Sequence, residues 1–236
     1  MLYIICGFIF GLMIPYLARR IGKLMPATMG YILLKLFVPT HSVSYGKLEE
    51  NPRYMILFRR YVMRSIGWGI FTAAATYLFA NNFDAAFTWW YITFLWILLL
   101  LVEIDKRFQL LPDILTLPLL VLGFAYAAQK GPWLATVDVN FLSYAQNSAL
   151  GAIMGYAMPV LASMFIVWKY PDAFGGGDIK LLCAVGAWVG MEIIAYIILL
   201  ACLIFGFSCL INRTRAAAFG PSIVYATLAL CLLLFG

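Results

Sequence analysis

The chain has 236 residues, of which 65% are hydrophobic and only 11% are charged, and its formal net charge is +6. Apolar runs recur along nearly the whole length, far beyond what a soluble core could bury, so a soluble globular protein is excluded. The runs are continuous blocks and not alternating patterns, which excludes a membrane β-barrel. The sequence therefore predicts an all-α, polytopic membrane helical bundle.

The apolar runs predict about eight transmembrane helices, several of them shorter than the roughly 20 residues that usually cross a bilayer. The first run has no basic flank before it and no cleavage site after it, so we expect a retained anchor. With the amino terminus outside, 15 of the 16 Lys and Arg residues fall on the inner side, and only Lys130 lies outside. In chain order, the spans are expected at 2–17, 66–80, 87–103, 114–128, 145–168, 179–190, 193–211 and 222–236.

The basic residues are explained by orientation in the membrane. Positive charge on the inner side orients the spans and contacts lipid headgroups, so membrane lipid is an expected partner and nucleic acid is not. The largest inner region, 18–65, mixes basic residues with apolar runs and is expected to be partly amphipathic. This region and the first helix form the first predicted part of the chain, residues 1–65. Residues 66–236 are predicted to form a membrane-embedded core.

Cysteine and histidine give no sign of a metal site. The five cysteines lie within apolar segments without a CxxC pair, so we expect buried thiols, and neither a zinc site nor a disulfide framework. His41 is the single histidine and is expected in a solvated loop. No metal is therefore predicted.

Acidic residues are scarce, and four of the ten lie at the predicted inner membrane boundary: Glu103, Asp105, Asp113 and Asp178. The other six fall in predicted loops or turns, where solvation explains them. An ionisable group near a span is by default a candidate for function. Asp113 and Asp178 also have a structural interpretation, because each stands where a helix is expected to begin and could cap it.

Asp105 is harder to explain structurally. It follows the apolar run "FLWILLLLVEI", at the carboxyl end of a predicted helix, where exposed carbonyl groups disfavour an anion. A residue that violates its local rule is where function is expected.

Asp105 and Asp178 together suggest a chemistry. The predicted topology places both on the same side at the same depth, where two close carboxyl groups would share one proton. Such a pair can deprotonate a water that attacks an amide carbonyl and protonate the departing nitrogen. Gly175, Gly176 and Gly177 precede Asp178 and would leave room for a substrate backbone. The triplet matches neither a P-loop nor a dinucleotide fingerprint, and no serine or cysteine protease site can be assembled.

Three segments resemble the type IV prepilin peptidases, which belong to the GxGD-type membrane aspartic proteases. They are "GGGDIKLL", "DKRFQLLPDILTLPLL" and "FGPSI", in family order within 90–236. The resemblance implies an aspartic endopeptidase that removes the leader of prepilins or pseudopilins at the cytoplasmic face of the bacterial inner membrane, with 66–236 as its peptidase core. Asp105 and Asp178 take the catalytic positions, Gly175, Gly177 and Lys180 complete the signature, and Asp113 and Glu103 are secondary candidates. Lys180 has an equally good interpretation as an interfacial anchor.

The first third departs from the family pattern. Many members carry two CxxC pairs there and also methylate the new amino terminus with S-adenosylmethionine, whereas 18–65 contains no cysteine. No cofactor is expected for peptide cleavage, and S-adenosylmethionine is expected only if the methyltransferase activity is retained. The sequence leaves the oligomeric state open. The alternative function is a proton-coupled transporter or assembly subunit, although the acids lie at one surface and not at the midplane.

Overall fold

In a computed structural model of the chain, the described residues are 2–25, 32, 52–82, 85–130, 143–167, 175–213 and 218–235. They form eight α-helices and one 3-10 helix, with no strand among them, so the predicted all-α class is confirmed. In chain order the helices are α1 (Leu2–Leu24), α3 (Pro52–Asn82), η2 (Ala85–Phe87), α4 (Thr88–Phe108), α5 (Asp113–Lys130), α6 (Tyr144–Val167), α7 (Gly176–Val189), α8 (Met191–Asn212) and α9 (Gly220–Phe235).

Each predicted span coincides with a helix, but two helices begin three or more residues before the predicted span. Helix α3 begins at Pro52 and not near residue 66, because its arginine-rich first half is also helical. Helix α7 begins at Gly176, so two residues of the glycine triplet belong to its first turn. Residues 26–31 and 33–51 of the predicted basic region, including His41, lie outside the described residues.

Three helices are long and apolar enough to cross a membrane: α1, α4 and α8. Two further apolar helices, 113–129 and 220–234, are shorter. The predicted number of eight transmembrane helices and the outward amino terminus are therefore not established by helix length and composition.

The chain divides into two compact units, Met1–Ile104 and Asp105–Gly236. In the first unit α1 packs on α3. A side chain at Gly11 would meet the Trp68 carbonyl oxygen at 2.5 Å, and one at Gly7 would meet the Thr76 hydroxyl at 2.7 Å. Glycines four residues apart allow two helix backbones to approach closely, as membrane helices commonly do. The division after Ile104 reflects spatial contacts, whereas the boundary predicted at residue 65 separates functional regions. The boundary at 65 therefore stays a prediction.

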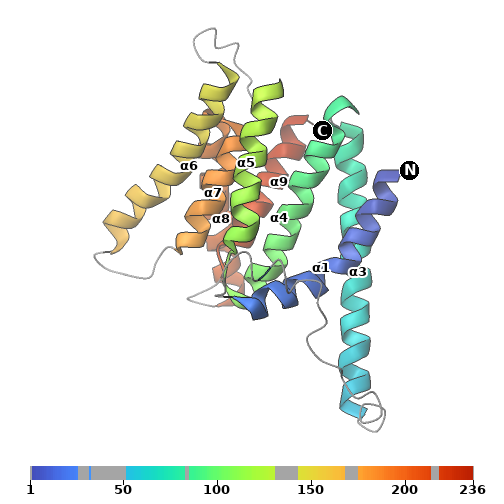
Figure 1. Cartoon of the computed structure of the whole chain (residues 1–236). Coiled ribbons are helices and arrows are strands. Elements are labelled where there is room, and N and C mark those ends of the chain that lie inside the picture. Colours follow the sequence, from blue (N-terminus) through green and yellow to red (C-terminus); the bar gives the residue numbers. More distant parts are fainter. Residues whose placement is uncertain are drawn as a thin grey trace. The chain divides into compact units, whose positions relative to one another are not determined.

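In the second unit α7 lies between α5 and α6, and the three helices run side by side in Figure 1. Gly151 of α6 and Gly186 of α7 are so close that a side chain on either would overlap the backbone of the other. One turn along α6, Gly155 meets the Leu182 backbone in the same way. The α6–α7 interface is therefore a backbone-to-backbone contact that only glycine permits.

The opposite face of α7 is anchored by Trp188, a fully buried side chain. Its indole N–H donates to the Leu119 carbonyl oxygen at 2.8 Å, and its ring stacks on Tyr126 at 5.3 Å between centroids. Gly190, with φ 82°, is the single residue between α7 and α8. These contacts fix the orientation of α7 about its own axis.

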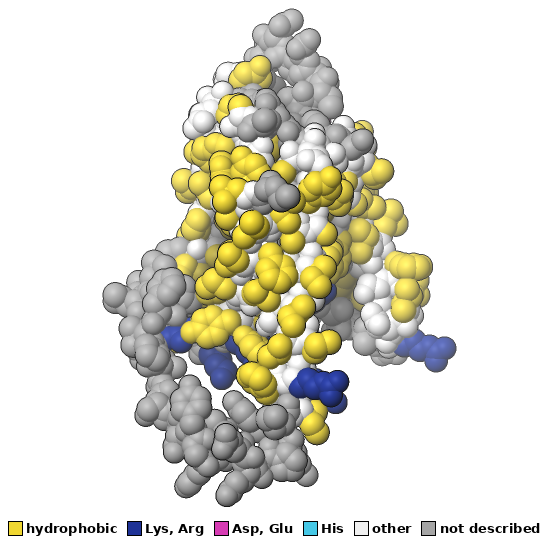
Figure 2. Space-filling view, turned by 90° about the vertical axis from the view of Figure 1, so that its right-hand side faces the viewer, with side chains coloured by type: hydrophobic (Ala, Val, Ile, Leu, Met, Phe, Trp, Pro, Cys, Tyr) yellow, Lys and Arg dark blue, Asp and Glu magenta, His cyan; other side chains and the backbone are white. Residues whose placement is uncertain are grey.

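Large hydrophobic side chains are exposed along most helices, as expected for surfaces that face lipid. Figure 2 shows such side chains over most of the described surface on one face. The expectation of buried thiols is wrong for most cysteines: Cys231 alone of the five is buried, and Cys202 is exposed. An apolar segment in a membrane bundle has an outer face, so apolarity alone did not predict burial.

Candidate active site

Asp105 lies in the last turn of α4, and its side chain is turned inward. The residue is 4% exposed, and its Oδ2 has no hydrogen-bond partner among the described residues. Gln109 ends the helix in the left-handed region, with φ 52°, and its N–H donates to the Asp105 carbonyl oxygen at 2.9 Å. An acid is thus buried at the negative end of a helix, as the sequence predicted.

Asp178 lies in the first turn of α7, but it is not the residue that caps the helix. The N-cap position belongs to Gly175, so the capping interpretation of Asp178 is incorrect in detail. Its carboxyl group instead reaches back to the backbone N–H of Gly175, as the third helical residue does in a capping box.

The two aspartates interact electrostatically. Burial, and then the charge of Asp105, raise the pKa of Asp178 to about 7. A charge acts in this way only when the two groups are close, because the interaction weakens with distance. The structure therefore brings together the two acids that the sequence paired.

The amino terminus of α9 lies against Asp105, which sequence reasoning did not include in the site. A side chain at Gly220 would be 2.5 Å from Asp105 Oδ2 and 3.1 Å from its Cγ, and the Gly220 backbone N–H faces the carboxyl group. The segment "FGPSI" was noticed only as a family likeness. A glycine followed by a proline at the start of an apolar helix was the available signal.

Leu111, in the connection between α4 and α5, lies between the two helix starts. Its Cδ1 would be 3.6 Å from a side chain added at Gly177 and 3.4 Å from one added at Gly220. The Cβ of Leu111 would be only 2.9 Å from a Cβ added at Gly177. Gly177 therefore has a packing function, whereas a side chain at Gly176 would face open space and meet no neighbouring atom within 4 Å.

Asp113 and Lys180 form an ion pair with each other. Lys180 Nζ lies 2.8 Å from both carboxyl oxygens of Asp113, and both side chains are about half exposed. Asp113 is the first residue of α5, and Pro112 precedes it at the helix start. The pair ties the beginning of α5 to the first turns of α7, so neither residue faces the aspartate pair as a bonded partner.

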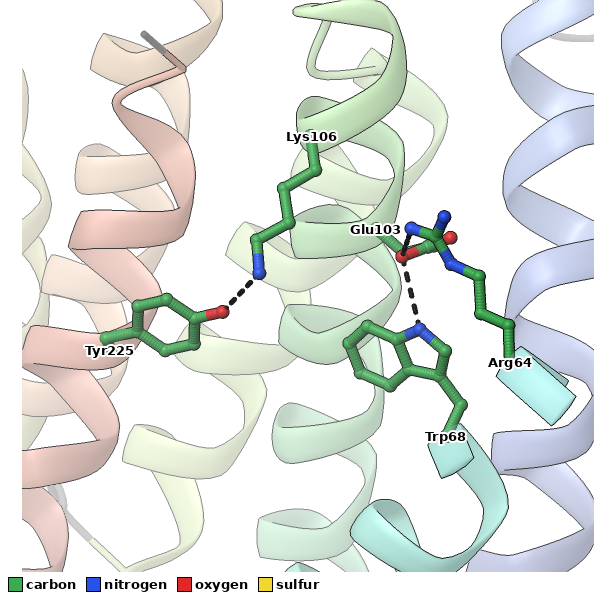
Figure 3. A network of polar contacts seen from close by, with 5 residues as sticks. All are labelled: Arg64, Trp68, Glu103, Lys106 and Tyr225. Carbon is green, nitrogen blue, oxygen red and sulfur yellow. Dashed lines mark hydrogen bonds and ion pairs between the residues drawn. The ribbon is translucent and has the colours of Figure 1, made fainter. Parts of the chain in front are cut away.

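Glu103 has a different environment from Asp105, although both are on α4. It is fully buried within the first unit, where its Oε2 accepts from Arg64 at 3.0 Å and from the indole N–H of Trp68 at 3.2 Å (Figure 3). Residues two apart on a helix point about 200° from each other, which separates the two acids. Glu103 thus balances an arginine of α3, which explains its burial without catalysis.

Lys106 and Tyr225 form a further contact that the sequence did not predict. Lys106 Nζ lies 2.5 Å from the Tyr225 hydroxyl and 5.1 Å from the centre of its ring (Figure 3). The contact joins the last turn of α4 to the first turns of α9. Because Lys106 is the residue after Asp105, this contact helps to hold α9 close to Asp105.

The arrangement suits proton transfer and water activation. One buried carboxyl group and one whose pKa is near neutrality can together hold a single proton, so one acts as a base while the other acts as an acid. Among the described residues, no cluster of three or more histidine, cysteine, aspartate or glutamate side chains could hold a metal ion.

Comparison with known proteins gives a consistent result. A sequence model described as the type IV leader peptidase family matches residues 92–210, which include both aspartates. Similar proteins named prepilin leader peptidase/N-methyltransferase are 40% identical over 107 residues in Escherichia coli K12, 32% over 130 in Neisseria gonorrhoeae and 31% over 166 in Dichelobacter nodosus.

These similarities are partial. They cover 44%, 53% and 66% of this chain, and 43%, 42% and 53% of the three relatives. The chain thus spans about half of the length of the curated relatives that it matches. No solved structure matches the chain.

Proposed function

The chain belongs to the type IV leader peptidase family, and we propose that it is a membrane aspartic endopeptidase that removes the leader from type IV prepilins or pseudopilins. The observation that carries this proposal is the electrostatic interaction between Asp105, which is buried, and Asp178, whose pKa is raised. The names of the curated relatives support prepilins as the substrate class.

The proposed reaction is hydrolysis without a covalent intermediate. The ionised carboxylate of the pair takes a proton from water while the water oxygen attacks the carbonyl carbon of the scissile peptide. The protonated carboxyl group then donates its proton to the departing nitrogen as the carbon–nitrogen bond breaks. The products are the leader with a new carboxyl group and the mature protein with a new amino group. Open space at Gly176 gives the substrate backbone a path to the pair.

We place this site at the cytoplasmic face of the bacterial inner membrane. The amino terminus is outside, eight spans cross the bilayer, and residues 66–236 form the peptidase core. The support for this topology is the Lys and Arg distribution, which puts nearly all cations on the inner side. Both aspartates lie just beyond an apolar segment, Asp105 after one and Asp178 before another, which suits a cut just outside the membrane.

Methylation of the new amino terminus, with S-adenosylmethionine as the methyl donor, is a separate part of the proposal. The relatives' names include N-methyltransferase, but the basic region 18–65 lacks the cysteines of the family pattern. Peptide cleavage by the aspartate pair requires no cofactor. The two activities can therefore be separated by experiment.

The test is cleavage of a prepilin-like substrate by purified protein in detergent, with product masses measured with and without S-adenosylmethionine. Asp105→Asn and Asp178→Asn should each abolish cleavage, since either change leaves the pair without its acid or its base. Asp113→Asn is the matched control and should retain activity, because Asp113 is paired with Lys180.

Full activity in either variant of the pair would refute the site. If no leader is cut by folded wild-type protein, proton transport or an assembly role becomes the better explanation of the two carboxyl groups. An added methyl mass would establish methylation independently of the cleavage result.

A further inference from the structure

The start of α9 is directed at the Asp105 carboxyl group. Phe219 accepts from the N–H groups of Ser222 at 2.9 Å and Ile223 at 3.3 Å, and Pro221 has no N–H. Gly220 therefore holds the one donor of this first turn that is not used within the helix. That donor faces the Asp105 carboxyl group.

We propose that Gly220 is a positioning residue, and that the amino-terminal turn of α9 favours the ionised form of Asp105 over that of Asp178, so that Asp105 acts as the base and Asp178 as the acid. This assignment rests on the proposed peptidase function. It adds a residue and a division of labour that neither the family likeness nor the aspartate pair alone provides.

The electrostatic argument begins with the position of Asp105 at the carboxyl end of α4. Helix carbonyl groups there carry partial negative charge and oppose a carboxylate. Asp105 is 4% exposed and its Oδ2 has no hydrogen-bond partner among the residues described, so water compensates little. A helix amino terminus carries partial positive charge and a free N–H, which favour an anion at this place.

The steric argument explains why the position is a glycine. A side chain at residue 220 would be 2.5 Å from Asp105 Oδ2, closer than real contacts allow, and 3.1 Å from Asp105 Cγ. The Leu111 Cδ1 atom, at 3.4 Å, closes the other side. Even alanine would move the α9 amide away from the carboxylate or rotate the carboxylate away from its partner.

On α4 the cations next to Asp105 are Lys106 and Arg107. The main influences on the Asp105 carboxyl group are its burial and the backbone of Gly220. Residues 220–235 contain no charged side chain, so the helix acts on Asp105 through its backbone. Lys106 contacts Tyr225, and Lys180 is occupied by Asp113. On α7 the facing group is Asp178, whose proton is retained because a second negative charge beside Asp105 is unfavourable.

The proposal gives each proton a direction. Asp105 takes the proton of the attacking water and becomes neutral, and Asp178 gives its proton to the departing nitrogen and becomes charged. The pair then returns to its starting state by transfer of one proton from Asp105 to Asp178. No other reactant than water is needed.

The experiment compares Gly220→Ala with Gly206→Ala, a change on α8 where an added side chain meets nothing within 4 Å. In detergent, Gly220→Ala should lower kcat/KM for a prepilin-like substrate by about 10²-fold, the size expected from small misplacement of a catalytic group. The acidic limb of its pH profile should move to higher pH, since the ionised form of Asp105 loses its donor. Gly206→Ala should match wild type in both respects.

A second measurement keeps the proposal testable if Gly220→Ala is poorly folded or no substrate is cleaved. The unfolding midpoint is measured for Gly220→Ala alone and in an Asp105→Ala background, where the crowded carboxylate is absent. The alanine at 220 should lower the midpoint strongly in the first background and little in the second. Equal shifts in both backgrounds, or an unmoved acidic limb in an active Gly220→Ala enzyme, would overturn the proposal. If wild type cleaves no substrate but the effect of Gly220→Ala on the midpoint still depends on Asp105, the result would count against the peptidase function alone.

Discussion

Gly177→Ala and Gly176→Ala should have opposite effects on stability, although the two glycines are neighbours in one helical turn. A side chain at Gly177 would be 2.9 Å from Leu111 Cβ, roughly 0.6 Å inside the shortest favourable carbon–carbon contact. Overpacking of this kind costs about 1–3 kcal/mol. At Gly176 an added side chain meets nothing within 4 Å.

The pair of variants is matched because both replace glycine by alanine in the first turn of α7. Alanine is favoured over glycine in a helix by up to about 1 kcal/mol, and this gain is common to both. The difference in free energy of unfolding between the variants should therefore be about 1–3 kcal/mol, with Gly177→Ala the less stable.

Gly177→Ala should also cleave substrate more slowly than wild type, since displacing the first turn of α7 displaces Asp178. A shift on the order of 1 Å can lower the rate about 10²-fold. The assays are a denaturant titration in detergent and turnover of a prepilin-like substrate. Equal unfolding midpoints for the two variants would refute the packing of Leu111 on Gly177. Loss of cleavage in a stable Gly176→Ala enzyme would show that the substrate needs the open space.

Other predictions concern pH, the ion pair and the glycine contact. Because the pKa of Asp178 is raised from 3.8 to about 7, its contribution to stability should be complete below about pH 4 and lost as the pH rises through 7. A pH series of unfolding midpoints should show this dependence more strongly in wild type than in Asp178→Asn. Cleavage should also decline above about pH 7, where Asp178 loses the proton it donates; an alkaline optimum would contradict this. Lys180→Ala should cost at most about 1 kcal/mol, since the pair with Asp113 is half exposed, and the cost should fade in high salt. Gly186→Ala should destabilise by about 3 kcal/mol or more, as the obstacle is the Gly151 backbone; a midpoint like that of wild type would exclude the α6–α7 contact.

Hydrophobic runs were sufficient to locate the helices but not their ends. Each predicted span coincides with a helix, because burying the backbone in an apolar setting requires internal hydrogen bonds. The start of α3 at Pro52 was missed since its arginines interrupt the apolar run without interrupting the helix. The start of α7 was missed because glycine disfavours helix interiors, whereas Gly176 and Gly177 are tolerated in its first turn.

The two aspartates of the candidate site could be identified from the sequence, but the residues that pack against them could not. Asp105 stood out because it opposes the local helix field, and that reasoning depends only on neighbours in sequence. Gly220 and Leu111 act through contacts with residues far along the chain, which no local pattern reports. The same limit applies to Glu103, whose partner Arg64 could not be identified from the sequence of α4.

The position of Leu111 between two glycines has a consequence for how relatives of this chain can diverge. Leu111 borders the space at both residue 177 and residue 220, but the nearest atom differs: an added side chain would be 2.9 Å from Leu111 Cβ at 177 and 2.5 Å from Asp105 Oδ2 at 220. Every residue except glycine has a Cβ atom, so a smaller residue at 111 makes no room at 177, and it leaves Asp105 in place beside 220. Relatives of this chain should therefore keep glycine at both positions whichever residue stands at 111.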